Sequence, residues 1–121
     1  MCSGDHRIAA PGYNIQANEV AIGIVLPYAA LAIMKLRLTP SAYQQSVGLS
    51  KVFFGETAVA AGFIDEIDLP ETVLGRAQEA ALEFTKLDLA AHAASKLRAR
   101  ADALAELRAG IDGLPAEFGV K

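Results

Sequence analysis

The stretch YNIQANEVAIG, residues 13–23, places one acidic residue, Glu19, directly before an apolar run that continues without a charge to residue 34. A carboxylate in that setting is expected to be shielded from water. Shielding disfavours the charged form of a carboxyl group, which lets a weak acid donate or accept a proton near neutral pH. Glu19 is therefore the candidate catalytic acid. The alternative is a solvated residue at a strand end or turn.

Three blocks of the sequence resemble the second half of an enoyl-CoA hydratase/isomerase of the crotonase superfamily. In the first block, residues 2–10 (CSGDHRIAA) resemble a strand of the C-D-x-R-I-A type, and residues 13–16 (YNIQ) resemble the short strand after it. In the second, NEVAIG (18–23) with the following Leu26-Pro27 resembles the segment that carries a catalytic glutamate. In the third, residues 54–67 (FGETAVAAGFIDEI) resemble the family's G-x-x-x-x-A-x-x-A-G block and the aspartate after it. The blocks occur in the family's order over nearly the whole chain.

The resemblance implies an α/β fold, a partial crotonase-like ββα spiral followed by a helical C-terminal oligomerisation region. The last turns of the spiral would occupy residues 1–69, and the helical region, which in the family drives trimers or dimers of trimers, would occupy residues 70–121. The hydrophobic content of 53% is high and lies largely on expected helices, which agrees with surfaces covered by other subunits. The partial spiral would also leave an open strand edge that favours pairing with another chain.

The resemblance implies an activity on acyl-CoA thioesters, the hydration of a 2-enoyl-CoA in fatty-acid β-oxidation. In hydratases of the family one glutamate deprotonates water and a second supplies a proton to the α-carbon. Glu19 matches the second acid in sequence order. Members with a single such acid can be double-bond isomerases, so both reactions stay open. Coenzyme A is part of the substrate, and no separate cofactor is implied.

The resemblance also implies that other parts of the active site lie outside this chain. The family's oxyanion-hole N–H groups come from a loop in the first half and from a helix that runs into residues 1–3, and the first glutamate lies on that helix. Losing oxyanion donors is expected to lower the rate at least about 100- to 1,000-fold. The alternatives are a non-catalytic fragment or pseudoenzyme that serves oligomerisation, and one half of a split enzyme whose partner polypeptide supplies the rest.

Three further residues are candidates for substrate binding. Pro27 and Tyr28 stand where the family commonly has a glycine-rich P-G-x-G-G segment, so Tyr28 is expected either to reshape the acyl pocket or to pack at a helix start. Lys96 belongs to the only basic cluster, together with Arg98 and Arg100. The resemblance implies that Lys96 contacts the phosphates of coenzyme A, in some members across a subunit interface. The alternative is a solvated helix face.

Composition argues against several other classes of partner. The chain has 121 residues and a formal net charge of -3, so no electrostatic attraction to nucleic acid or to an anionic membrane is expected. The uncharged run of residues 20–34 is shorter than the roughly 20 apolar residues that a spanning helix needs. It is also interrupted by Gly23 and Pro27, so no membrane segment is expected.

Cysteine and histidine usage indicates neither a disulfide nor a metal site. Cys2 is the only cysteine, which fits a reducing cytoplasm. His6 and His92 lack the spacing of a metal-binding motif and are expected to be ordinary packed or interface residues. No metal is therefore assigned.

Local signals predict the individual elements. Proline and capping residues mark helix starts, and glycine marks helix ends. The predicted elements are a buried strand or turn over residues 20–26, a helix from about Tyr28, a helix opened by Thr39 and Pro40, a short helix over 56–61 stopped by Gly62, a short strand or extended segment after it, a helix that begins at Pro70, and a long helix over 89–109 capped by Asp88 and stopped by Gly110.

Overall fold

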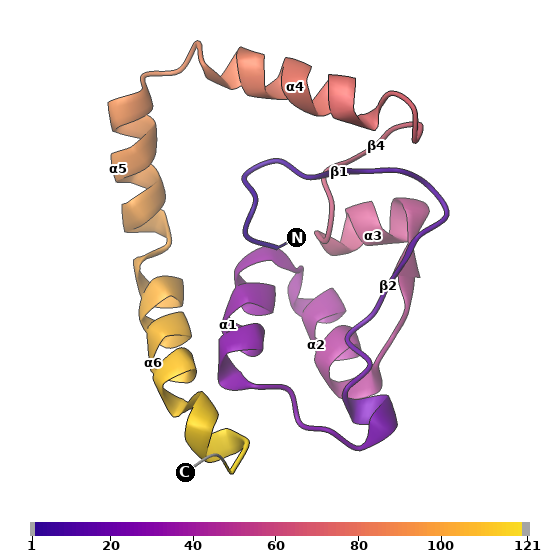
Figure 1. The fold of residues 1–121 in the computed structure, drawn as a ribbon, viewed down its shortest axis with the longest axis vertical. Coiled ribbons are helices and arrows are strands. Elements are labelled where there is room, and N and C mark those ends of the chain that lie inside the picture. The colour runs from indigo at the N-terminus through magenta and orange to yellow at the C-terminus, as the bar shows by residue number, and fades with distance from the viewer. Residues whose placement is uncertain (1, 120–121) are drawn as a thin grey trace.

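A computed structural model describes residues 2–119 as a mostly helical protein with two small sheets (Figure 1). The order of elements along the chain is β1 (Ile8–Ala9), β2 (Asn14–Ile15), the 3-10 helix η1 (Val20–Ile22), α1 (Tyr28–Arg37), α2 (Pro40–Leu49), β3 (Phe53–Phe54), α3 (Gly55–Ala61), β4 (Glu66–Ile67), α4 (Val73–Phe84), α5 (Leu89–Ala99) and α6 (Ala101–Glu117). Both strands that the first sequence block predicts are present. Mixed helices and strands agree with the expected α/β class.

Each sheet joins two of the blocks that lie far apart in the sequence. Strand β1 pairs in parallel with β4, with Ile8 opposite Glu66. Strand β2 pairs antiparallel with β3, with Ile15 opposite Phe53. The block at residues 54–67 therefore lies beside the N-terminal blocks, as a spiral in which later turns pack on earlier ones requires.

The hydrophobic core lies between α2, α3 and the strands. Phe53 and Phe63 are both buried, and their ring centroids are 5.2 Å apart in a tilted arrangement. Aromatic pairs at this distance stabilise a core beyond the area that they bury. The buried members of the core are Leu38, Ala42, Phe53, Ala58, Ala61, Phe63 and Ile64.

The capping signals of the first helices are confirmed. The Thr39 side chain accepts a hydrogen bond from the Ala42 N–H at 3.3 Å and caps α2. Gly62 ends α3 with a φ of 89°, a left-handed conformation that favours glycine. A Cβ at Gly62 would also lie 2.5 Å from the carbonyl oxygen of Arg37. Only glycine therefore fits between α3 and the end of α1 without a shift of the backbone.

The C-terminal helices differ from the prediction of one helix over residues 89–109. The Asp88 side chain accepts from the Ala91 N–H at 2.8 Å and caps α5 as predicted, but the helix breaks at Arg100, and α6 continues to Glu117. Gly110 lies inside α6 and does not end it. It is buried against α1, where an added Cβ would be 2.6 Å from the Ala29 nitrogen.

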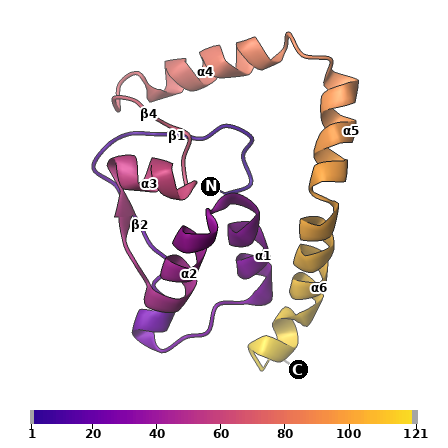
Figure 2. The ribbon, with the colours of Figure 1, turned by 180° about the vertical axis from the view of Figure 1, so that it is seen from behind.

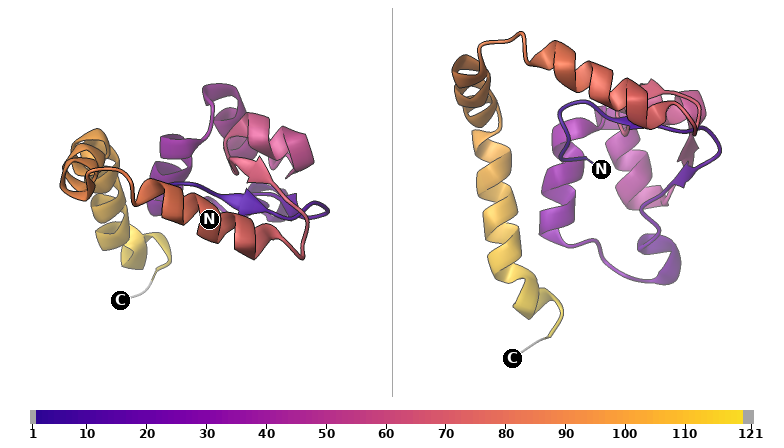
Figure 3. Two further views of the ribbon diagram at one scale, coloured as in Figure 1. Left: turned by 90° about the horizontal axis from the view of Figure 1, so that it is seen from above. Right: turned by 45° about the horizontal axis from the view of Figure 1, so that its top comes forward.

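The predicted role of Gly110 was wrong because the reason for this glycine lies in tertiary packing. Helix α6 runs beside α1, and glycine lets their backbones approach closely. Helix α4 crosses one end of the molecule, and α5 leads from it to α6 (Figures 1 and 2). The two further views show the same arrangement of α4, α5 and α6 around the remaining elements (Figure 3).

Two other expectations need correction. Helix α4 begins at Val73 and not at Pro70, because a turn comes first in which Leu69 O accepts from the Val73 N–H at 2.9 Å. Residues 20–26 form a turn, one of the two predicted forms, but they are mainly exposed. Val25 is 84% exposed and only Leu26 is buried. Within residues 2–119, the contacts of this segment with α1 and α2 leave its other apolar side chains exposed.

The structure does not test the division of the chain at residues 69 and 70, which stays a prediction. Across residues 2–119, no helix has the length and the apolar character that a membrane span requires.

Candidate functional site

Glu19 is the N-cap residue of the 3-10 helix η1. Its backbone carbonyl accepts hydrogen bonds from the N–H groups of Ile22 at 3.1 Å and Ile24 at 2.8 Å, which folds the following residues back over it. Gly23 ends the turn in a left-handed conformation. The side chain is half-buried, and its Oε2 atom is buried with no hydrogen-bond partner among residues 2–119.

The turn that carries Glu19 is fastened to the end of α2. Ser50 Oγ accepts a hydrogen bond from the Ala21 N–H at 3.1 Å. The Ser50 carbonyl oxygen accepts another from Gln16 Nε2 at 2.7 Å. The segment around Glu19 therefore has one anchor before the acid and one after it.

An apolar cavity of about 360 Å³ lies beside the turn. Val20, the residue after Glu19, lines it together with Leu31 of α1 and Val47 of α2. The full lining is Val20, Gly23, Ile24, Val25, Leu26, Leu31 and Val47. Because that lining has no charged or polar side chain, the cavity is suited to an aliphatic group.

Pro27 and Tyr28 lie at the start of α1, between two cavities. Pro27 occupies the N-cap with a φ of −64°, which proline adopts without strain. Tyr28 is 70% exposed and lines a second cavity, of about 630 Å³, with residues of α1, α2 and α6. The ion pair of Lys35 and Glu106, at 3.2 Å, lies in the same lining. Tyr28 therefore belongs to the lining of this larger cavity, and its role in an acyl pocket stays a prediction.

Lys96 is engaged with a carboxylate of its own chain. Asp5 accepts from Lys96 Nζ at 2.5 Å and from Arg100 Nη2 at 2.7 Å, and His92 Nε2 lies 3.8 Å from it. The hydrogen bond from Lys96 is the main reason why the pKa of Asp5 lies below its usual value. These contacts fasten α5 to the N-terminal loop.

The structure does not bring Lys96 to Glu19. Helix α5 lies at one end of the molecule, and η1, in the purple segment between β2 and α1, lies at the other (Figures 1 and 3). Pro27 and Tyr28, in contrast, are connected to Glu19 through the short segment that lines the apolar cavity. Tyr28 itself lines the larger cavity and not the apolar one beside η1. The role of Lys96 stays a prediction.

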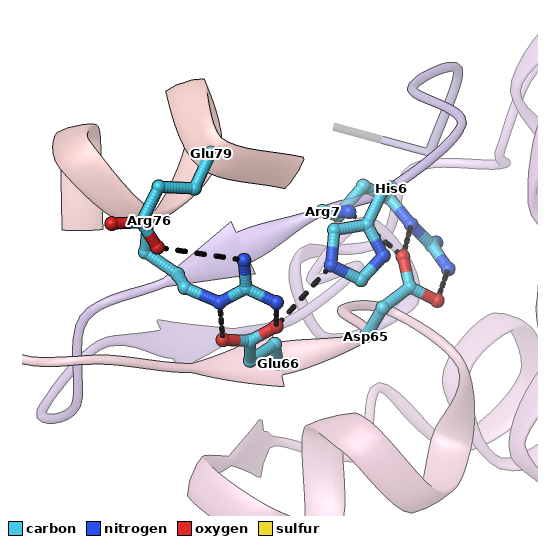
Figure 4. A network of polar contacts seen from close by, with 6 residues as sticks. All are labelled: His6, Arg7, Asp65, Glu66, Arg76 and Glu79. Atoms are coloured by element: carbon cyan, nitrogen blue, oxygen red, sulfur yellow. Dashed lines mark hydrogen bonds and ion pairs between the residues drawn. The ribbon is translucent and has the colours of Figure 1, made fainter. Parts of the chain in front are cut away.

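A separate polar network connects α4 to the β1–β4 sheet (Figure 4). Glu66 accepts from Arg76 Nε at 2.6 Å and Nη2 at 3.1 Å, and His6 Nε2 lies 3.4 Å from the same carboxylate. The Arg76 guanidinium lowers the pKa of Glu66 by hydrogen bonding, and Glu66 in turn raises the pKa of Arg76. The His6 ring also packs edge-on against Phe84, with centroids 5.8 Å apart. His6 is thus a packed residue, as the sequence predicts.

The part of the chain from residue 2 to residue 119 contains no cluster of three or more His, Cys, Asp and Glu side chains that could hold a metal ion. His92 contacts Asp5 on an exposed face of α5.

Comparison with known proteins identifies the fold. No protein-family model and no curated protein matches the chain, whereas many solved structures do. The probable enoyl-CoA hydratase EchA3 of Mycobacterium tuberculosis H37Rv is 71% identical, with a TM-score of 0.94, over 98% of this chain and 50% of that chain. An apo structure of the same M. tuberculosis protein, described as an enoyl-CoA isomerase, is 72% identical with a TM-score of 0.93, over 97% of this chain and 52% of that chain. An enoyl-CoA hydratase/isomerase family protein of Pseudomonas syringae is 36% identical with a TM-score of 0.86, over 92% and 49% of the two chains.

The fold is that of a crotonase-type protein, as a partial ββα spiral with a helical C-terminal region. The chain belongs to the enoyl-CoA hydratase/isomerase family and matches the C-terminal half of the family's fold. It spans about half the length of the solved structures that it matches. The resemblance found in the sequence is thereby confirmed.

Two residues of the site were not found from the sequence. Ser50 follows the helix predicted from Thr39 and Pro40, but nothing local to it indicates contacts with residues 16 and 21. Asp5 lies in the first sequence block, and its contacts with α5 join residues about 90 positions apart. The one local sign is that Ser50 stands at the end of a predicted helix, where glycine is usual, and carries a hydroxyl group there.

Proposed function

We propose that Glu19 is the proton-transferring acid of a site that acts on acyl-CoA thioesters, by hydration or isomerisation of an enoyl-CoA. The observation that carries the proposal is the buried Oε2 atom of Glu19, which makes no hydrogen bond to residues 2–119. Buried side-chain polar atoms are nearly always hydrogen-bonded, and a catalytic role is one explanation of an exception. The hydrogen-bonding capacity of this oxygen is not used by the described residues.

The neighbourhood of Glu19 supports chemistry at a carbon atom. The cavity lined by Val20, the residue that follows Glu19, is otherwise lined by aliphatic residues and glycine, which suits the binding of an acyl chain. Both reactions need a proton to be placed on, or taken from, a carbon near the thioester carbonyl. A carboxyl group at the edge of an apolar cavity can transfer that proton over a hydrogen-bonding distance.

The first acid and the oxyanion-hole donors of the family are proposed to come from polypeptide that is not part of residues 1–121. The same M. tuberculosis relative is described as a hydratase in one structure and as an isomerase in another, so its descriptions leave both reactions open. Glu19 serves both in the same way, because both require proton transfer at carbon.

Substrate contacts are proposed for Pro27, Tyr28 and Lys96. Pro27 and Tyr28 would shape the acyl pocket, since they follow directly on the cavity residue Leu26. Lys96 would contact the phosphates of coenzyme A bound to another copy of the chain, because α5 lies far from η1. Phosphate binding would compete with Asp5, which accepts a hydrogen bond from Lys96 in this structure. Coenzyme A would enter as part of the substrate, and no further cofactor is proposed.

The assembly and the setting are proposals of the same kind. A homo-oligomer, a trimer or hexamer, agrees with the exposed apolar side chains of α4 and α5. Leu74, Leu82, Leu89 and Leu97 are each more than 60% exposed. A role in fatty-acid metabolism in the cytoplasm would follow from the substrate class. The same exposed residues favour the alternative function, a non-catalytic fragment or pseudoenzyme that serves oligomerisation.

An absorbance assay tests the proposal. The purified chain would be given a short 2-enoyl-CoA, alone and mixed with a polypeptide that comprises the first half of M. tuberculosis EchA3, and the loss of the conjugated thioester would be followed. Glu19→Gln, which keeps the size of the side chain, is the matched control. Turnover that disappears in the variant supports the proposal, whereas equal turnover refutes the role of Glu19. Turnover only in the mixture, or co-purification of a crotonase-like N-terminal half, indicates a split enzyme, and a folded chain without turnover in either form favours the oligomerisation role.

A further inference from the structure

Ser50 is a buried residue that forms hydrogen bonds to the chain on both sides of Glu19. Ser50, only 8% exposed, accepts from the Ala21 N–H through its hydroxyl and from Gln16 Nε2 through its carbonyl oxygen. The two donors lie three residues before Glu19 and two residues after it. Both hydrogen bonds connect parts of the chain that are about 30 residues apart, so neither arises from local helix or turn formation.

The backbone of Ser50 is strained for a serine. It caps α2 with a φ of 49° and a ψ of 36°, and within residues 2–119 it is the only residue other than glycine with a positive φ. In this left-handed conformation a Cβ atom crowds the neighbouring carbonyl oxygen, which is why glycine or asparagine is usual there. Glycine would cap the helix without strain. What serine adds at this position is the hydroxyl group that binds Ala21.

The bond to Ala21 acts on the turn that sets the direction of the Glu19 side chain. The Ala21 N–H belongs to η1, in which the Ile22 N–H bonds back to the carbonyl oxygens of residues 18 and 19. Without Ser50 Oγ, the Ala21 N–H would have no partner except water, and η1 would have one anchor fewer to the rest of the protein. The position of the acid relative to the apolar cavity depends on that anchor.

We infer that Ser50 is the positioning residue of Glu19, and that its hydroxyl holds η1 in the arrangement that proton transfer requires. The inference rests on the proposed function of Glu19. Misplacing a reacting group by about 1 Å lowers the rate by up to about 100-fold, even when the change lies outside the reacting atoms. Ser50 itself touches no substrate in this account.

Two variants separate positioning from a merely structural role. Ser50→Gly removes the hydroxyl and relieves the left-handed strain, so it is expected to unfold at nearly the same urea concentration as the wild type. Ser50→Asn tolerates the same backbone and carries a side-chain oxygen that can accept from Ala21, so it is the rescue variant. Ser41→Ala is the matched control, because it removes another α2 hydroxyl, which accepts only from Gln45 on an exposed face.

The measurements are kcat and KM for a short 2-enoyl-CoA in whichever form of the protein turns over, and hydrogen exchange of the Ala21 amide in the chain. In Ser50→Gly we expect kcat to fall roughly 10- to 100-fold with KM nearly unchanged, and Ala21 exchange to rise about tenfold. Ser50→Asn should recover part of both, and Ser41→Ala should change neither. A stable Ser50→Gly protein with wild-type kcat and wild-type Ala21 exchange overturns the inference.

Failure of the proposed function gives a different result. In that case wild type and Glu19→Gln show the same rate, or none, and the Ser50 variants are judged by nuclear magnetic resonance of the chain. Faster Ala21 exchange together with a displaced carboxyl-carbon resonance of Glu19 in Ser50→Gly supports the positioning role. Unchanged signals at both residues overturn it.

Discussion

Arg7 binds both carboxylate oxygens of Asp65. Its Nε and Nη2 atoms lie 2.9 Å from Oδ2 and Oδ1, respectively, and its backbone N–H donates to Oδ2 at 2.8 Å (Figure 4). Its Nη1 donates to the carbonyl oxygen of Gly62 at 2.7 Å. All three guanidinium nitrogens of Arg7 therefore donate a hydrogen bond, and these bonds compensate for burial of a residue that is only 8% exposed. The pair connects the strand β1 to the segment that leads into β4.

Replacement of Asp65 by asparagine should destabilise the fold by about 2 kcal/mol, the usual contribution of hydrogen bonds to a charged group. The variant leaves the buried Arg7 charge without its carboxylate. Urea unfolding at neutral pH measures the loss. Glu79→Gln is the control, because Glu79 is exposed and lies 3.9 Å from Arg76, and it should change stability by less than about 0.5 kcal/mol. Equal stability of the two variants would contradict the structural role of the pair.

The same pair predicts a dependence of stability on pH. The pKa of Asp65 is lowered in the folded protein, first by the hydrogen bond from Arg7, and the pKa of Asp5 is lowered by Lys96. A carboxyl group whose pKa is lower in the folded state adds stability above its unfolded-state pKa, about 4, and this stability is lost as the pH falls through the folded-state pKa. The free energy of unfolding should therefore decrease from about pH 5 downward. In Asp65→Asn the decrease should be shallower, and urea titrations from neutral to acidic pH that give parallel curves would exclude this origin.

Gly110→Ala should separate α6 from α1. The new Cβ would lie 2.6 Å from the nitrogen and 2.9 Å from the Cα of Ala29, and a helix backbone cannot yield as a flexible side chain can. Overpacking of this kind lowers stability by about 1–3 kcal/mol. Gly75→Ala, in α4, is the matched control. Nothing lies within 4 Å of its added Cβ, so the change should stabilise the protein by up to about 1 kcal/mol through helix propensity.

Thermal unfolding of the two glycine variants gives the comparison directly. The melting temperature should fall for Gly110→Ala and should rise slightly for Gly75→Ala. A rise in both would mean that α6 does not pack closely on α1 in solution.

Asp5→Asn should loosen α5 without unfolding the rest of the protein. Asp5 is partly exposed, so each of its ion pairs contributes less than about 1 kcal/mol to global stability. The amides of α5 should nevertheless exchange hydrogen faster, since Lys96 and Arg100 lose their common partner. Hydrogen exchange resolved along the chain measures the effect, with the amides of α2 as the internal reference. Unchanged α5 exchange would show that other contacts hold this helix.

Local chemistry made much of the fold predictable from the sequence. Thr39, Asp88 and Gly62 act as caps through contacts within a few residues, so their signals are present in the sequence itself. The family blocks predicted the strands within residues 2–10 and 13–16, and they marked Glu19 as the candidate acid. The pairing of these strands with residues 53–67 joins segments about 40 to 60 residues apart, which no local pattern encodes.

Tertiary contacts decide what the sequence did not reveal. Gly110 looked like a helix end, but its missing side chain is required by the backbone of α1. Residues 20–26 are apolar and were expected to be buried, yet most of them are exposed and only Leu26 is buried. The two anchors of Glu19 on Ser50 depend on the approach of two segments about 30 residues apart, which no local pattern encodes.

The incorporation of solvent deuterium at the α-carbon of a short acyl-CoA tests the central claim most directly, because this exchange needs proton transfer by Glu19 but no hydration step. The wild-type chain and Glu19→Gln would be compared in heavy water, each alone and with the first half of M. tuberculosis EchA3, after circular dichroism shows that both are folded. We predict that the wild type incorporates deuterium and that Glu19→Gln does so about 100- to 10,000-fold more slowly. Incorporation at the same rate in both proteins would contradict the assignment of Glu19 as the proton-transferring acid.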